Sequence, residues 1–139
     1  MILYLDTSVV LRILLKEPRP LRSWGDWEEA VSSDLMGVEA RRAIDRSRLD
    51  AALDDAQVAE LHQQLRQVEI RLRRVAVNRR ILGRAAQPMA TSVKTLDAIH
   101  LASALLFQEV RGAAVLFATH DGQQATAARA LGFECTGFP

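Results

Sequence analysis

The chain begins with Ile2-Leu3-Tyr4-Leu5-Asp6-Thr7-Ser8-Val9-Val10, and this stretch decides the fold that we expect. Its first half is an apolar run with no polar alternation, which is typical of a strand covered on both faces inside a parallel sheet. Asp6 ends the run, and apolar residues then recur at helical spacing as far as Leu15. An acid between a central strand and a helix lies where open α/β sheets bind their ligands. The simpler alternative is that Asp6 only caps the helix.

Length and composition limit the class of protein. A chain of 139 residues is enough for one domain with a full core, so we expect a single domain over residues 1–139. Its net charge of +1 neither demands nor excludes a polyanionic partner. The sequence shows neither a membrane-spanning run nor a signal peptide, which predicts a cytoplasmic protein. Cys135 is the only cysteine, so an internal disulfide and a cysteine-rich metal site are excluded.

A second apolar strand repeats the pattern of the first. Val115–Ala118 is followed by Asp121, and a helix is expected to begin there. If this strand pairs with the first one, Asp6 and Asp121 are neighbours at one edge of the sheet. Right-handed crossovers then bring the starts of the following helices to the same edge.

Two more acids are predicted near this edge. Glu39 lies one turn into a helix that follows a short strand at Val31-Ser32, beside Val38, which we expect to face inward. Asp97 lies in the first turn of a very apolar helix, for which Thr95 is the expected N-cap. The helix dipole favours a carboxylate there, but an acid in so apolar a helix is costly unless it is paired.

These four carboxylates cannot simply lie together, because each raises the pKa of the others. A hard divalent cation resolves the conflict, and Mg²⁺ or Mn²⁺ prefers sites of carboxylates and water. Such a metal activates water and stabilises the charge on a leaving oxygen, which suits phosphodiester hydrolysis. The candidate metal-binding and catalytic residues are Asp6, Glu39, Asp97 and Asp121.

The remaining elements are predicted with less detail. Trp24 and Trp27 fall at helical spacing and are expected to pack inward, with stacking on nucleic-acid bases as the alternative. Asp54 or Asp55 is expected to cap a helix with an apolar stripe. The expected helices are Thr7–Lys16, Leu21–Ala30, Leu35–Leu49 and Arg79–Ala86. The expected strands are Arg74–Val77 and an edge strand at Phe133–Thr136.

Arginine is dense between residues 66 and 84, where only Glu69 opposes it in the sequence. This density indicates either a solvated face or a phosphate-binding surface. Helical and strand periods would spread the side chains in several directions. The arginines are Arg66, Arg71, Arg73, Arg74, Arg79, Arg80 and Arg84.

Other kinds of site fit less well. The three histidines are too scattered for a zinc site. His100 lies one turn after Asp97, but a hydrogen-bonded helix residue is a better interpretation than a metal ligand. Asp6-Thr7-Ser8 is similar to the haloacid dehalogenase phosphatases, which require a second acid where Ser8 stands. No Gly-rich phosphate loop is present.

Four stretches taken together resemble the PIN-domain family, and within it the VapC-type toxins of bacterial type II toxin–antitoxin pairs. The stretches are Leu5–Val10, Ser33 with Glu39–Ala43, Thr95–Ala104 and Ala118–Asp121. The third is the most specific, and the resemblance covers essentially the whole chain.

We therefore expect a three-layer α/β/α sandwich with a mainly parallel sheet of four or five strands, and the resemblance implies the strand order 3-2-1-4-5. It also implies a Mg²⁺- or Mn²⁺-dependent endoribonuclease that cleaves structured RNA, with a homodimeric state and a cognate antitoxin. The four acids match the family's metal-binding positions, and Ser8 matches a hydroxyl that supports the first acid. The alternative is a noncatalytic PIN-like module for RNA binding or scaffolding.

Overall fold

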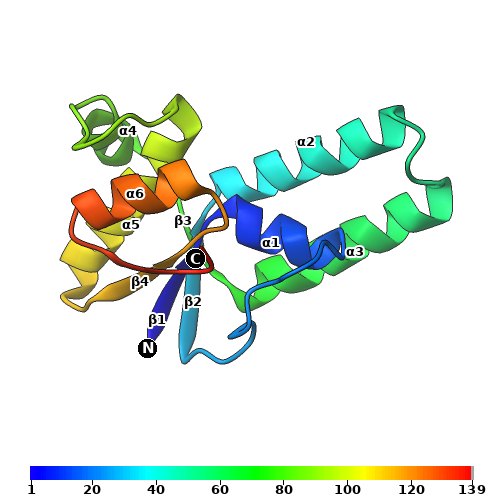
Figure 1. Ribbon diagram of the computed structural model, residues 1–139, viewed down its shortest axis with the longest axis horizontal. Coiled ribbons are helices and arrows are strands. Elements are labelled where there is room, and N and C mark those ends of the chain that lie inside the picture. Colours follow the sequence, from blue (N-terminus) through cyan, green and yellow to red (C-terminus); the bar gives the residue numbers. More distant parts are fainter. Residues whose placement is uncertain (139) are drawn as a thin grey trace.

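A five-stranded parallel sheet is the centre of the computed structural model, which describes residues 1–138 (Figure 1). Its strand order is β3-β2-β1-β4-β5, so β1 lies in the middle. The predicted fold class and strand order are therefore confirmed. The strands are β1 (Ile2–Leu5), β2 (Glu29–Ser33), β3 (Arg73–Val75), β4 (Val115–Ala118) and β5 (Glu134–Thr136).

Within residues 1–138 the strands are joined by six helices, which are α1 (Thr7–Leu14), α2 (Leu35–Leu49), α3 (Asp55–Arg71), α4 (Arg79–Ala85), α5 (Thr95–Arg111) and α6 (Gly122–Ala130). Residues of α1, α2 and α3 form one hydrophobic cluster with the sheet, and residues of α5 and α6 form another. The hairpin of α2 and α3 extends away from the sheet (Figure 1). None of these helices is both long and apolar enough to span a membrane.

The sequence of β1 explains the two layers of helices. Successive side chains of a strand point to opposite faces, so Leu3 and Leu5 enter the cluster of α1–α3 while Tyr4 enters the cluster of α5 and α6. All three side chains are fully buried. β1 pairs with β4 in a register that places Leu5 opposite Ala118, and the Asp6 N–H donates to the Ala118 carbonyl at 2.9 Å.

Helix ends follow local chemistry in two informative places. Asp54 caps α3 in a capping box: its side chain accepts from the Gln57 N–H, and the Gln57 side chain accepts from the Asp54 N–H. Of the two predicted capping residues, Asp54 is therefore the N-cap, and Asp55 is the first residue of the helix. At the start of α5, Lys94 is the N-cap and Thr95 is the first helical residue, so the predicted N-cap was one residue too late.

The helix predicted over Leu21–Ala30 is wrong. Residues 22–25 form a turn, Gly25 adopts a positive φ of 88°, and the strand β2 already begins at Glu29. The inward packing of the tryptophans is confirmed, because Trp24 and Trp27 pack against the core with their rings edge to face at 5.2 Å. Spacing alone could not distinguish a helix from a turn that buries the same two rings.

One side-chain direction on α2 was also predicted wrongly. Val38 is 59% exposed, whereas Met36, Ala40 and Ile44 face the core. Glu39 is nevertheless partly buried, with a side chain that is 22% exposed. Because Glu39 precedes Ala40 on the helix, it lies at the border of the buried face.

Acids from other parts of the chain pair with several arginines of the region between residues 66 and 84. Arg73 pairs with Glu29, Arg74 with Glu69, and Arg80 with Glu109. Glu29 and Glu109 come from distant parts of the chain, which is why the sequence suggested a single opposing acid. This region therefore contains several structural ion pairs.

Candidate acidic site

The four candidate acids lie where parallel strands end and helices begin. Asp6 directly follows β1, and Asp121 is the N-cap of α6, three residues after β4 ends. Glu39 and Asp97 lie near the starts of α2 and α5. The carboxyl ends of parallel strands share one edge of the sheet, so the topology brings these acids to a common region.

Asp6 is held firmly by its neighbours and is only 5% exposed. Its Oδ2 accepts hydrogen bonds from Ser8 Oγ at 2.6 Å and from Thr119 Oγ1 at 2.8 Å. Ser8 Oγ in turn accepts from the His120 N–H at 3.0 Å. The start of α1 and the loop after β4 thus fix one oxygen of Asp6.

Glu39 is held by a buried histidine. His100 Nε2 lies 2.6 Å from Glu39 Oε1, which also accepts from Thr7 Oγ1 at 2.7 Å. On the other side of the ring, His100 Nδ1 and Tyr4 Oη are 2.8 Å apart. Since His100 has no exposed surface, it is a hydrogen-bonded helix residue, in line with its interpretation from the sequence.

The protonation of this pair follows from its contacts. Burial by itself would raise the pKa of Glu39, but the hydrogen bond and charge of His100, with the Thr7 hydroxyl, lower it below its usual value. Burial would lower the pKa of His100, but the bond to Glu39 and the charges of Asp6 and Asp97 raise it. The contacts therefore favour the ionised form of Glu39 and the protonated form of His100.

Asp121 and Asp97 differ in how they are held. Asp121 Oδ1 accepts from the backbone N–H groups of Gln123 and Gln124 at 2.8 and 3.1 Å. The Asp97 carboxylate has no hydrogen-bond partner among residues 1–138. Burial raises the pKa of Asp97 to about 6, with further contributions from the charges of Asp6, Asp121 and Glu39, which outweigh His100. The charges of Asp6, Asp121 and Glu39 thus act on Asp97.

The donor chemistry suits a hard divalent cation. Asp6, Glu39 and Asp121 each use one oxygen in hydrogen bonds, and their second oxygens accept none from residues 1–138. Such carboxylate oxygens are the ligands that Mg²⁺ and Mn²⁺ prefer. As they stand, the described side chains include no group of three His, Cys, Asp or Glu that could hold an ion.

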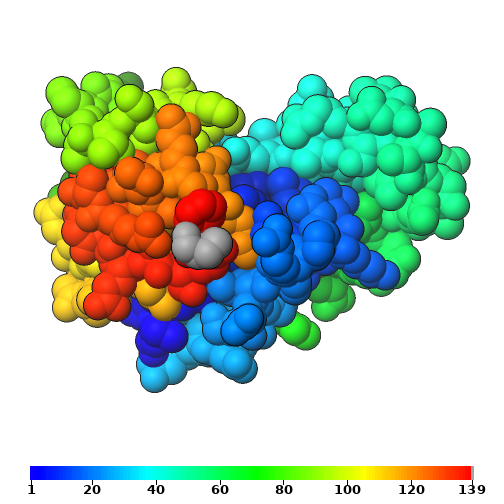
Figure 2. Space-filling model, viewed as in Figure 1, coloured from blue at the N-terminus to red at the C-terminus, as the bar shows by residue number. Residues whose placement is uncertain are grey.

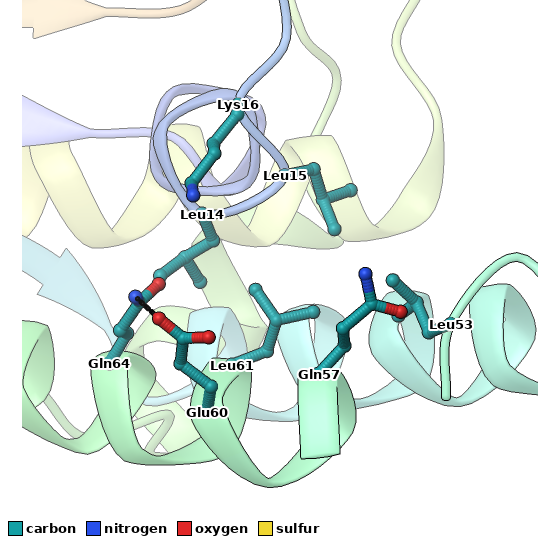
Figure 3. Close-up of a pocket in the computed structure, with 8 residues that line it drawn as sticks. All are labelled: Leu14, Leu15, Lys16, Leu53, Gln57, Glu60, Leu61 and Gln64. Carbon is teal, nitrogen blue, oxygen red and sulfur yellow. Dashed lines mark hydrogen bonds between the residues drawn. The ribbon is translucent and has the colours of Figure 1, made fainter. Parts of the chain in front are cut away.

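A separate small cavity lies away from these acids (Figure 3). Its volume is about 210 Å³, and it lies between the end of α1 and α3. Leu14 and Leu61 form part of its wall, while Glu60 and Gln64 are joined by a hydrogen bond of 3.1 Å. None of the four acids lines it, so it is not part of the acidic site.

The fold is shared with several toxins of known structure. FitAcB from Neisseria gonorrhoeae is 21% identical, with a TM-score of 0.65 over 100% of this chain and 97% of that chain. VapBC2 from Rickettsia felis, bound to a DNA fragment from its promoter, is 11% identical, with a TM-score of 0.67 over 98% of both chains. The sarcin-ricin loop cleaving toxin VapC20 from Mycobacterium tuberculosis is 15% identical, with a TM-score of 0.64 over 96% of both chains. No match was found among curated proteins.

A parallel α/β sandwich with acids at the carboxyl edge of its sheet defines the class of this protein. The family profile of the PIN domain matches residues 3–130, which is most of the sequence. The chain belongs to the PIN domain family, and its structural neighbours are VapC and FitB toxins of toxin–antitoxin complexes.

The raised pKa of Asp97 predicts a dependence of stability on pH. Because the pKa is about 6 in the folded state, against an ordinary value of 3.8 for an aspartate in an unfolded chain, the folded protein holds this proton more tightly. The contribution of Asp97 to stability therefore falls as pH rises from about 4 to about 6. In EDTA at pH 7, the free energy of unfolding of Asp97→Asn should exceed that of wild type by about 1–2 kcal/mol, a value that allows for solvent screening. Near pH 4 the two proteins should have equal free energies of unfolding.

Urea unfolding at both pH values measures this difference. Asp26→Asn, at an exposed loop position, is the matched control and should show no such gap. An Asp97→Asn protein that is clearly less stable than wild type at pH 7 would mean that Asp97 is a structural anchor.

The ion pair of His100 and Glu39 predicts a strong energetic coupling. In a double-mutant cycle of His100→Gln and Glu39→Gln, the two substitutions should couple by about 1–3 kcal/mol, because each one leaves the other charge without its partner. The exposed pair of Asp45 and Arg48, at 2.8 Å, is the control and should couple by less than about 0.5 kcal/mol. Equal couplings in the two cycles would contradict a buried ion pair.

Proposed function

We propose that this chain is a Mg²⁺- or Mn²⁺-dependent endoribonuclease, and that it is the toxin of a type II toxin–antitoxin module. Its substrate would be structured RNA, in a loop of a transfer or ribosomal RNA. The catalytic and metal-binding residues would be Asp6, Glu39, Asp97 and Asp121. The observation that carries this proposal is the mutual electrostatic influence of four carboxylates at one edge of the sheet.

The relatives support both parts of the proposal. VapC20 is described as a toxin that cleaves the sarcin-ricin loop, which favours RNA as the substrate class. A neighbour from Klebsiella pneumoniae is a toxin–antitoxin complex, and VapBC2 was crystallised with a DNA fragment from its promoter, which favours an antitoxin as the partner of this chain. An acidic site also attracts a basic side chain, so an arginine of an antitoxin could compete with the metal there. A homodimer is part of the same proposal.

Each residue has a definite task in this proposal. A divalent ion, when bound, would activate water and stabilise the negative charge that develops at the phosphate. Ser8 and Thr119 orient Asp6 through its Oδ2, which leaves Oδ1 for the ion. His100 keeps Glu39 ionised and fixes its orientation. Because His100 is completely buried, it acts on Glu39 and does not touch the substrate.

The test is cleavage of a total RNA preparation by the purified chain in Mn²⁺ or Mg²⁺. Wild type should cut at few sites, and EDTA or Asp6→Asn should lower the rate by at least about 100-fold, since an anchored ligand of the ion is lost. Asp26→Asn, at the exposed loop position, should retain the rate of wild type. Mapping the new RNA ends identifies the substrate.

The alternative module for RNA binding or scaffolding makes the opposite prediction. Such a module tolerates Asp6→Asn and leaves RNA intact in either metal. Cleavage that persists in EDTA or in the Asp6→Asn protein would contradict the proposed mechanism.

A further inference from the structure

A basic cleft lies next to the acidic site. It has a volume of about 1050 Å³, which is enough for a nucleotide-sized ligand. It is formed by α1, the loop after α1, the loop after β4, and the segment that follows β5. Figure 2 shows this C-terminal segment, in red, beside the blue N-terminal part of the chain. Its lining includes Arg12, Arg19, Arg22, His120 and Phe138.

The charge of this cleft is poorly compensated. Arg19 and Arg22 are exposed and form no ion pair with any residue from 1 to 138. Arg12 has one acid nearby, Glu17, at 3.7 Å, and its guanidinium donates to the Arg19 carbonyl at 3.3 Å. Arg12 thus braces the loop that carries the other two arginines. A cluster of three arginines with a single weak acid favours an anionic ligand.

Two buried nitrogen atoms in the cleft lack partners. His120 Nδ1 lies 2.7 Å from the Gly137 carbonyl, but His120 Nε2 has no hydrogen bond with residues 1–138. Arg12 Nε likewise makes no hydrogen bond within the described part of the chain, and its nearest acid is Glu17, at 3.7 Å. Both atoms are enclosed in the wall of the cleft.

The aromatic ring of Phe138 also lines the basic cleft. Phe138 is 38% exposed, although large apolar side chains are usually covered. Its ring lies against Gly122, where an added Cβ would be 2.8 Å from the ring. The glycine therefore leaves room for the ring beside the start of α6. An exposed ring beside arginines is the usual combination for binding single-stranded nucleic acid.

The cleft is connected to the acids by direct bonds. Ser8 donates to Asp6 and accepts from the His120 N–H, and His120 lines the cleft. Arg12 lies one helical turn after Ser8 on α1. The cleft therefore adjoins Asp6 through Ser8 and His120.

We infer that this cleft binds the single-stranded RNA segment that adjoins the scissile phosphate, with Arg19 and Arg22 contacting phosphates and Phe138 stacking on a base. The inference rests on the proposed function, because it names a second contact surface for the same substrate. It differs from the arginine-rich region expected between residues 66 and 84, where acids from elsewhere in the chain pair with several of the arginines.

The test is binding of a 2′-O-methyl RNA oligonucleotide of about ten nucleotides, in EDTA, by fluorescence anisotropy at several salt concentrations. This probe needs neither metal nor cleavage. Arg19→Gln with Arg22→Gln should weaken binding by about tenfold and lower the salt slope by about 1.4, since each single-strand phosphate contact contributes about 0.7. Phe138→Leu should weaken binding by about fivefold.

The matched control is Arg46→Gln with Arg129→Gln, which removes the same charge from exposed positions on α2 and α6. It should bind as wild type does, and thermal melts should show that all variants are folded. In RNA cleavage, Arg19→Gln with Arg22→Gln should raise KM and leave kcat near that of wild type, because these arginines do not touch the scissile phosphate.

Three results would overturn the inference: unchanged binding by the variant of Arg19 and Arg22, an equal loss in the control, or no binding by wild type. The last result is also the one expected if the cleft accepts an acidic protein segment. Binding through the cleft without any cleavage in Mn²⁺ would refute the proposed nuclease and leave the cleft as an RNA site.

Discussion

Repulsion among carboxylates is the main constraint at the carboxyl ends of the parallel strands, where the four candidate acids lie. Four acids lie at one edge of the sheet, and their charges act on one another. The fold compensates in two ways: it buries His100 beside Glu39, and it supplies hydroxyl and N–H donors to one oxygen of Asp6 and of Asp121. Asp97 receives no such donor within residues 1–138, and it is the acid whose pKa rises to about 6. In the proposed function, a divalent ion would offset the remaining charge.

The parallel sheet makes this arrangement possible. Because β1 and β4 are neighbours in register, the residues after them emerge together, and the hydroxyl of Thr119 reaches the carboxylate of Asp6. The side chains of β1 alternate between two helical layers, so its end is surrounded by helix starts from both layers. Two hydrogen bonds connect Asp6 to the basic cleft: Ser8 donates to Asp6 and accepts from the N–H of His120, which lines the cleft. The acids and the arginines therefore form adjacent surfaces of opposite charge.

Much of this could be predicted from local sequence patterns. The buried strands β1 and β4 are apolar runs, each followed by an acid, and Asp54 caps α3 as the sequence predicts, whereas the N-cap of α5 is Lys94 and not the predicted Thr95. Contacts between distant residues could not be predicted in this way. Glu39 and His100 are 61 residues apart, and nothing near either of them identifies the other as its partner. Glu29 and Glu109, which neutralise Arg73 and Arg80, are similarly remote. The cleft joins Arg12 to Phe138, from opposite ends of the chain.

If the other three acids act on Asp97, the pKa of Asp97 must depend on their charges. The side-chain carboxyl ¹³C signal of Asp97 can be followed by NMR against pH in the metal-free protein, in wild type and in Asp6→Asn. We expect the pKa of Asp97 to be about 6 in wild type. It should be lower in Asp6→Asn, because that substitution removes one repelling charge. A wild-type value near 3.8 that is unchanged in Asp6→Asn would contradict it.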